Sequence, residues 1–267
     1  MERLPARHFI LTLGRSGSNF FVNALNQHPQ VFNFGEVLGE WMVVRKMQRR
    51  AFFMPKDDAG YLDYMYKSRL MLFGAQLNKK RQAARGGAPY VWKPRAEIRS
   101  VGIKDFSLNL IEFGLQSYLA DRPDIKVICL RRTHVFERAL SYIMLKATGV
   151  VSTVGGKPAK SDKTVTIDPQ TLHTILSNVA RENDELAEMA GALAPDRVLD
   201  IEYETYFGRP ETQEATNVAL FEFLGVPPIA VKQAHRKIIT KKPSEIIENY
   251  DECRAFLSGT PFADYFE

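Results

Sequence analysis

The stretch His8–Pro29 reads HFILTLGRSGSNFFVNALNQHP, and it sets the pattern for the rest of the chain. Its apolar run Phe9–Leu13 is typical of a buried strand. The polar residues Gly14–Ser18 follow, and Asn19–Asn26 has apolar residues at helical spacing. This helix is expected to end at His28, because a residue before proline avoids the α region. The stretch therefore predicts a strand, a short loop and a helix.

The same alternation continues along the chain. Further strands are predicted at Val31–Phe34, Ser100–Ile103, Lys126–Leu130 and Arg197–Tyr203. Helices are predicted at Leu108–Leu119, His134–Lys146, Asp168–Leu193, Glu214–Leu224 and Ser244–Leu257. Alternating strands and helices favour an α/β fold, a three-layer sandwich with a mainly parallel central sheet. We expect a single domain over residues 1–267, with a variable helical region at about 41–99 and a mobile loop at about 148–166.

Composition narrows the class of ligand. The formal net charge is +5, which suits an anionic ligand but is too small and too scattered to favour nucleic acid. Cys129 and Cys253 lie far apart, so a reducing compartment is favoured over a disulfide framework. No apolar run approaches the length of a membrane span. We therefore expect a cytoplasmic protein.

The loop after the first predicted strand has the features of a phosphate site. Gly17 permits a turn that other residues resist, and the start of the following helix favours an anion. Ser16, Ser18 and Asn19 offer side-chain hydrogen bonds, and Arg15 offers a permanent cation. The alternative is an ordinary strand-to-helix turn in which Ser18 or Asn19 caps the helix.

The loop is not that of a nucleoside triphosphatase. The pattern GxxxxGK[ST], with its lysine and its magnesium-binding hydroxyl, is absent. Lys104 and the pair Arg131-Arg132 each follow a predicted strand, as the loop does. Because the carboxyl ends of parallel strands share one edge, we expect all three at the same edge of the sheet.

The stretch His8–Pro29 resembles the N-terminal signature of sulfotransferases that use PAPS, 3′-phosphoadenosine 5′-phosphosulfate. The likeness is to the bacterial carbohydrate and Nod-factor type, trehalose sulfotransferases included. It implies a P-loop-like sulfotransferase fold in which Arg15, Ser16, Gly17, Ser18 and Asn19 bind the 5′-phosphosulfate, and 3′,5′-ADP is the product. The family usually has Ser or Thr at the position of Asn19.

Two later stretches support the resemblance. Residues Val127–Ser141, VICLRRTHVFERALS, are similar to the family's 3′-phosphate motif, in which a strand ends in Arg and a Ser follows on the next helix. The resemblance assigns this role to Ser141 with Arg131 or Arg132, and it does not decide between the two. Residues Lys237–Asp251 resemble the family's basic C-terminal segment, which makes Lys241 and Lys242 candidates for a loop over the nucleotide. The alternative is two solvated lysines.

The resemblance also implies catalytic residues. The related carbohydrate sulfotransferases place a glutamate at the position of Glu36, which is expected to accept the proton of the acceptor hydroxyl; Glu40 is the second choice. Arg15 would stabilise the charge on the sulfonate. Lys104 is expected at the end of its strand, in reach of the leaving phosphate or the acceptor. No metal is expected.

The resemblance thus predicts transfer of a sulfuryl group from PAPS to a hydroxyl of a small molecule, sugar or glycolipid. The oligomeric state stays open, a homodimer included. One alternative is a magnesium-dependent nucleotide kinase with a degenerate phosphate loop. The other is a non-catalytic module that binds an anionic glycan or nucleic acid through its basic surface.

Overall fold

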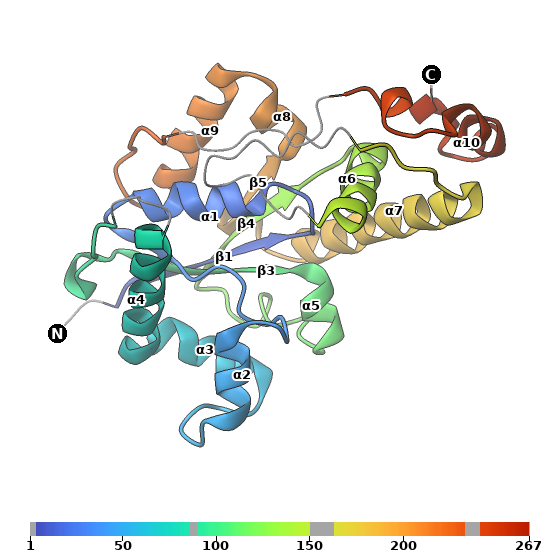
Figure 1. Cartoon of the computed structure of the whole chain (residues 1–267). Coiled ribbons are helices and arrows are strands. Elements are labelled where there is room, and N and C mark those ends of the chain that lie inside the picture. The colour runs from blue at the N-terminus through green and yellow to red at the C-terminus, as the bar shows by residue number, and fades with distance from the viewer. Residues whose placement is uncertain (1–3, 86–89, 150–162, 233–240, 267) are drawn as a thin grey trace. The chain divides into compact units, whose positions relative to one another are not determined.

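The computed structural model describes residues 4–85, 90–149, 163–232 and 241–266. The chain divides into two compact units (Figure 1). The first unit comprises Met1–Arg131 with Leu186–Lys232, and the second comprises Arg132–Glu185 with Gln233–Glu267. Each unit is therefore built from two separate pieces of the chain. The single domain over residues 1–267 stays a prediction.

A parallel sheet forms the centre of the first unit. Its five strands lie in the order β2-β3-β1-β4-β5, and every neighbouring pair is parallel. The strands are β1 Ala6–Thr12, β2 Val31–Asn33, β3 Ser100–Phe106, β4 Ile125–Arg131 and β5 Val198–Glu202. The α/β prediction is confirmed. After β1 the chain builds β2 and β3 on one side and β4 and β5 on the other, so the order reverses between β1 and β4.

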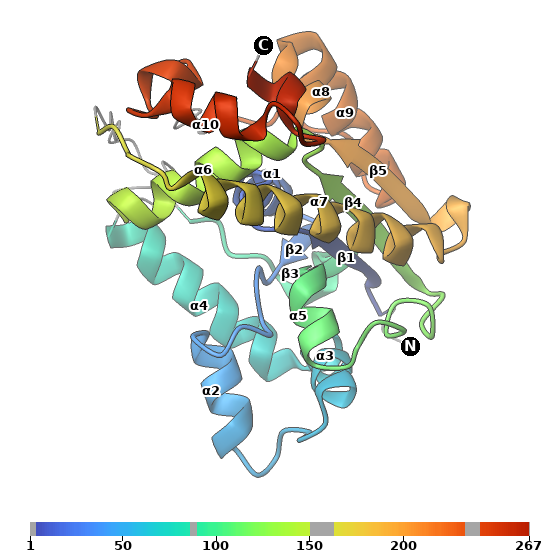
Figure 2. The same ribbon diagram turned by 90° about the vertical axis from the view of Figure 1, so that its right-hand side faces the viewer.

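Helices cover both faces of this sheet, as Figures 1 and 2 show. Ile10 of β1 packs with apolar residues of α1 (Ser18–Gln27), α8 (Tyr203–Gly208) and α9 (Pro210–Phe223). Its neighbours Phe9 and Leu11 face the other way, in a cluster shared with α3 (Asp58–Lys67), α4 (Arg69–Arg85) and α5 (Ser107–Glu112). Successive residues of a strand point to opposite faces, so an apolar run such as that of β1 requires cover on both.

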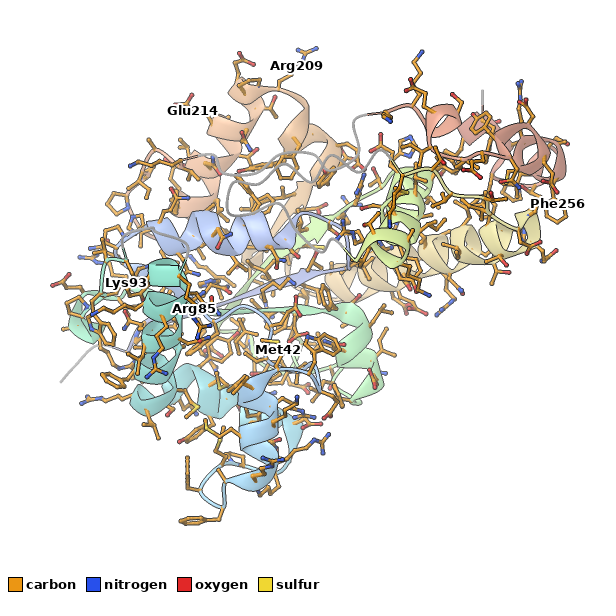
Figure 3. The ribbon with its side chains drawn as sticks, viewed as in Figure 1. Met42, Arg85, Lys93, Arg209, Glu214 and Phe256 are labelled. Carbon is orange, nitrogen blue, oxygen red and sulfur yellow. The ribbon has the colours of Figure 1, made fainter. Side chains whose placement is uncertain are left out.

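The two ends of α1 are closed differently. The ammonium of Lys93 donates to the carbonyl oxygens of Asn26 and Val31, at 2.7 and 2.6 Å, beside the C-terminal end of α1 (Figure 3). A cation is favourable at that negative end of the helix dipole. Gly17 caps the N-terminal end, and no side chain accepts a hydrogen bond there. The positive end of the dipole thus points to the loop that follows β1.

The second unit is mainly helical. Its elements are α6 Val135–Thr148, the greater part of α7 Pro169–Gly191, and α10 Tyr250–Leu257. Apolar residues of these helices form a cluster of their own around Phe136, Leu176 and Leu257. Most of the loop predicted at 148–166 lies outside the described residues. The chain also contains α2 Val43–Arg50 and the short 3₁₀ segments Arg95–Glu97, Pro195–Arg197, Pro243–Glu245 and Ala263–Phe266.

Two predicted helix boundaries are wrong, and one helix was not predicted. The helix predicted to reach Leu119 ends at Glu112, because Gly114 adopts a left-handed conformation and its N–H donates to Ile111. The C-terminal helix begins at Tyr250 and not at Ser244, since Ile247 instead forms a parallel bridge with Val165. The helix α8 has no counterpart among the predicted elements.

Gly102 of β3 gives a direct test of the sheet packing. The imidazole of His8 fills the space above Gly102, and a Cβ there would lie 1.9 Å from Nε2. We expect Gly102→Ala to lower the free energy of unfolding by about 2 kcal/mol or more, as overpacking does. Gly74→Ala is the control: a Cβ there meets nothing within 4 Å, so it should be neutral or slightly stabilising. Urea unfolding measures both, and equal effects would contradict this packing.

Candidate functional site

Side-chain hydroxyl groups hold the loop after β1 in place. The hydroxyl of Thr12 donates to the carbonyl oxygen of Leu130 on β4 at 3.0 Å. The hydroxyl of Ser16 is buried and donates to the carbonyl oxygen of Leu13 at 2.7 Å. Ser16 therefore shapes the loop, and the loop lies where the strand order reverses, between β1 and β4.

Two residues of the loop are left-handed. Arg15 has φ 66° and Gly17 has φ 71°. A Cβ on Gly17 would lie 2.9 Å from the ring of Phe207 and 3.0 Å from that of Tyr203, so this position requires glycine twice over. Arg15 is the one non-glycine residue with positive φ in the described part of the chain. Such backbone strain is held in place by the structure around it and is common at ligand-binding loops.

The first helical residues after this loop are Ser18 and Asn19. Gly17 is the N-cap of α1, so neither Ser18 nor Asn19 caps the helix. The alternative interpretation, a turn in which one of these two residues is the N-cap, is therefore wrong. Amide groups at the start of a helix, with the positive end of its dipole, bind phosphate well. The crowded glycine, the left-handed turn and the helix start without a side-chain cap together fit a phosphate-like anion.

A second polar feature is the ion pair between Glu36 and Lys104. Nζ of Lys104 lies 2.5 Å from Oε1 of Glu36 and 4.0 Å from the centre of the Phe106 ring. Lys104 is 1% exposed, whereas Glu36 is partly exposed. Burial lowers the pKa of Lys104, and the carboxylate of Glu36 opposes that shift. The predicted strand end at Lys104 is wrong, since β3 continues to Phe106, but the side chain does reach the candidate base.

The backbone before Glu36 is held by contacts with two strands. Gly35, with φ 80°, donates its N–H to Oδ1 of Asn33 at 2.8 Å. Its carbonyl oxygen accepts from the N–H of Lys104 at 3.1 Å. Asn33 ends β2 and Lys104 belongs to β3, so Glu36 leaves the sheet in a defined direction.

The backbone after Glu36 is held by one buried carboxylate. Oδ2 of Asp105 accepts from the N–H groups of Val37 and Leu38 at 3.0 and 2.8 Å. Its Oδ1 accepts from the N–H of Phe106 and the side-chain amide of Asn109. Burial raises the pKa of Asp105, and these four donors oppose that shift. Glu36 is thus held from both sides by backbone contacts of its neighbours.

A buried imidazole supports Asn33 in turn. Nδ1 of His8 lies 2.8 Å from the hydroxyl of Ser100, and Nε2 lies 3.1 Å from Nδ2 of Asn33. Because Oδ1 of Asn33 accepts from Gly35, its Nδ2 is the donor, so Nε2 of His8 accepts. Burial lowers the pKa of His8 to about 3. Sequence analysis missed His8, Asn33 and Asp105; the signal was a polar residue inside or beside an otherwise apolar strand.

The candidates for the 3′-phosphate are divided between the units. Arg131 ends β4 in the first unit and forms a two-pronged ion pair with Asp200 of β5. Arg132 belongs to the second unit, is buried, and pairs with Glu137 of α6 at 2.9 Å. Ser141 of α6 is also buried.

The remaining candidates are two lysines and the second glutamate. Lys241 and Lys242 are exposed residues of the second unit, and most of the basic stretch before them, 233–240, lies outside the described residues. Glu40, the second choice for the base, is exposed and pairs with Arg49. Glu36 is therefore the better placed of the two glutamates.

Comparison of the sequence with known proteins identifies the family of the chain. The chain is similar to the sulfotransferase family over residues 8–229. It belongs to the sulfotransferase family. It is 26% identical to Nodulation protein H of Rhizobium meliloti over 277 residues, which cover 99% of this chain and 96% of the relative. The corresponding protein of strain 1021 is also 26% identical, over 275 residues. This agrees with the resemblance to the Nod-factor type, and the protein is a sulfotransferase enzyme.

Solved structures of proteins named as sulfotransferases are similar as well. A sulfotransferase from Alicyclobacillus acidocaldarius is 16% identical, with a TM-score of 0.49 over 95% of this chain and 91% of that one. The sulfotransferase domain of the Synechococcus PCC 7002 olefin synthase is 16% identical, with a TM-score of 0.47 over 97% of each chain.

Among the helices in the described residues, none has the length and apolar character to cross a bilayer.

The sulfotransferase should lose stability in acid through His8. Its pKa is about 3 in the folded chain against 6.5 unfolded, so the unfolded chain binds the extra proton between these values. The contribution of neutral His8 to the free energy of unfolding is complete above pH 6.5. It is lost as the pH falls toward 3, at about 1.4 kcal/mol per pH unit. As the pH is lowered from 6.5 toward 3, we expect the free energy of unfolding to decrease less steeply in His8→Gln than in the wild type. Parallel pH profiles in urea unfolding would rule out this role.

Proposed function

We propose that the sulfotransferase transfers a sulfuryl group from PAPS to a hydroxyl of a sugar or glycolipid. One observation carries the proposal: after β1 a strained loop leads into a helix start that has no side-chain cap, while a carboxylate–ammonium pair lies between the β2 end and β3. Both belong to the carboxyl-terminal edge of one parallel sheet, where ligands of such sheets bind. The sugar acceptor is supported by the resemblance to the carbohydrate and Nod-factor type.

In the proposed reaction the acceptor oxygen forms a bond to sulfur while the bond between sulfur and the phosphate oxygen breaks. Glu36 accepts the proton of the acceptor hydroxyl, and 3′,5′-ADP leaves. Positioning and stabilisation of spread negative charge account for most of such a transfer. The amides of Ser18 and Asn19 and the guanidinium of Arg15 would hold the phosphosulfate. A base such as Glu36 contributes about 10²–10⁴-fold.

Lys104 is proposed to position the base. Its ammonium holds one carboxylate oxygen of Glu36 and leaves the other oxygen for the acceptor. An ion pair taken out of water must be well arranged to offset its desolvation. The ring of Phe106 and the buried side chain of Lys104 provide that arrangement.

The 3′-phosphate is proposed to bind Arg132 and Ser141. Arg131 is less suited, since Nε and Nη2 of its guanidinium already donate to the carboxylate of Asp200. Arg132 and Ser141 belong to the same unit, and α6 carries the serine. A fixed guanidinium with a hydroxyl is a good site for a dianion. Lys241 and Lys242 are proposed to add positive charge over the nucleotide.

Three further expectations stay proposals. The region of about 41–99 shapes the acceptor site, and the chain acts as one domain over residues 1–267. A cytoplasmic location is supported by the two buried free thiols of Cys129 and Cys253, as expected in a reducing compartment.

Titration calorimetry with 3′,5′-ADP and with ATP, each with and without magnesium, tests the donor. We expect 3′,5′-ADP to bind tightly without magnesium and ATP to bind weakly, because the site recognises a 3′-phosphate and lacks the lysine–hydroxyl pair of a triphosphate loop. Arg132→Ala should abolish the binding of 3′,5′-ADP, and Arg131→Ala should retain most of it.

The rival functions give different results. A nucleotide kinase would bind ATP better and require magnesium. A non-catalytic anion-binding module would bind both nucleotides weakly and lose affinity steeply with salt. Either pattern would overturn the proposed function.

Glu36→Gln tests the base. The amide keeps the shape of the side chain but cannot accept the proton, so we expect kcat to fall by about 10²–10⁴-fold with unchanged affinity for 3′,5′-ADP. The control is Glu40→Gln, which should retain activity because Glu40 is exposed and pairs with Arg49. The readout is sulfate transfer from PAPS to a sugar acceptor over a range of pH. Normal turnover in Glu36→Gln would remove this residue from the mechanism.

A further inference from the structure

The helix α2 packs its polar side toward the protein. Arg45 is 1% exposed and Gln48 is buried, whereas Val43 on the opposite side is 81% exposed and Met47 is exposed. An amphipathic helix of a globular protein normally buries its apolar side. In α2 the usual arrangement is inverted.

The buried side of α2 makes several polar contacts, and Nε of Arg45 is the one atom of its guanidinium that is buried without a hydrogen-bond partner among the described residues. The guanidinium of Arg45 pairs with Asp58 at 2.5 Å and lies 4.7 Å from the centre of the Phe113 ring. The side-chain amide of Gln48 donates to the carbonyl oxygen of Pro55 at 2.8 Å. These contacts fix how the helix is rotated, so its apolar residues are directed outward by the fold itself.

The outward residues form one continuous surface. Residues 43, 46, 47 and 50 fall within about 100° of one another around a helix of 3.6 residues per turn. The two phenylalanines that follow the C-cap Ala51 are exposed as well, Phe52 at 93% and Phe53 at 48%. We call it the α2 surface: Val43, Lys46, Met47, Arg50, Phe52 and Phe53. In Figures 1 and 2, α2 lies at the end of the first unit that is farthest from α1.

The charge on the α2 surface is positive. Lys46 and Arg50 are exposed, and neither forms an ion pair with any residue in the described part of the chain. Two of the nearby acids are already paired, Glu40 with Arg49 and Asp58 with Arg45, and the third, Asp57, caps α3. Two uncompensated cations thus stand beside exposed aromatic and aliphatic groups.

We propose that the α2 surface binds the surface of an anionic lipid bilayer, with the helix lying in the interface. Helices that do so combine apolar residues with lysine and arginine, whose long stems let the charged ends reach the lipid headgroups. Phe52 and Phe53 would enter the boundary between headgroups and acyl chains. This inference is independent of the proposed donor and acceptor, but it would bring the enzyme to the place where a glycolipid acceptor lies.

A second copy of the chain fits this surface less well. In a twofold interface the same patch meets itself, so Lys46 and Arg50 would face a like-charged surface. An anionic bilayer instead neutralises both cations. The charge therefore favours a lipid surface over self-association.

Vesicle sedimentation tests the proposal with the full-length enzyme. We expect binding to vesicles with equal parts of phosphatidylglycerol and phosphatidylcholine, little binding to phosphatidylcholine alone, and weaker binding in high salt. Each basic residue near an anionic surface contributes about fivefold, so Lys46→Gln/Arg50→Gln should weaken binding about 30-fold. Phe52→Ser/Phe53→Ser should weaken it at least about tenfold.

Matched controls use exposed residues elsewhere. Leu70→Ser/Val218→Ser removes two exposed apolar groups, and Lys80→Gln/Arg81→Gln removes two exposed cations of α4; both should bind vesicles as the wild type does. All four variants should keep the wild-type affinity for 3′,5′-ADP, which shows that they fold. Binding that is absent, equal on neutral vesicles, or equally weakened by the controls would overturn the proposal. So would light scattering that shows a dimer lost in the α2 variants, because the occupant would then be a second copy.

Discussion

The ion pair of Glu36 and Lys104 places a lysine ammonium inside a parallel sheet, where desolvation is expensive. An ammonium and a carboxylate taken out of water cost several kcal/mol each, and their attraction offsets this only with good geometry and further contacts. The surrounding structure provides both. Asp105 and Asn33 fix the backbone on either side of Glu36, and Phe106 lies under the ammonium. Much of the polar interior of the first unit is thus arranged around one carboxylate.

This arrangement explains why polar residues interrupt the strands. His8, Asn33 and Asp105 are each completely buried, and each makes hydrogen bonds to neighbours in the sheet or the following loop. A buried polar group without partners would cost free energy, but a satisfied network favours one conformation over its alternatives. Gly102 is required by the same network, because only a residue without a side chain leaves room for the imidazole of His8.

The amino-acid sequence predicts the strand, loop and helix of His8–Pro29 and the parallel sheet well, since both depend on local patterns. The apolar runs locate the strands, and Gly17 marks the turn. The polar network could not be predicted from the sequence. Tertiary pairing determines which face of the sheet a strand residue points to and which strand lies next to it. Lys104 shows this: the pattern ended the strand at a polar residue, whereas the structure continues it to Phe106. The inverted orientation of α2 could not be predicted for the same reason. Arg45 is buried because its guanidinium pairs with Asp58 and packs over the ring of Phe113.

The network also connects acid sensitivity with catalysis. Nε2 of His8 accepts from the amide of Asn33 only while the imidazole is neutral. Protonation would turn that nitrogen into a donor facing another donor, and Asn33 would lose the contact that orients it toward Gly35. The disturbance would pass to the backbone beside Glu36, since Gly35 immediately precedes it. The direction of the proposed base and the acid limit of the fold therefore depend on the same hydrogen bond.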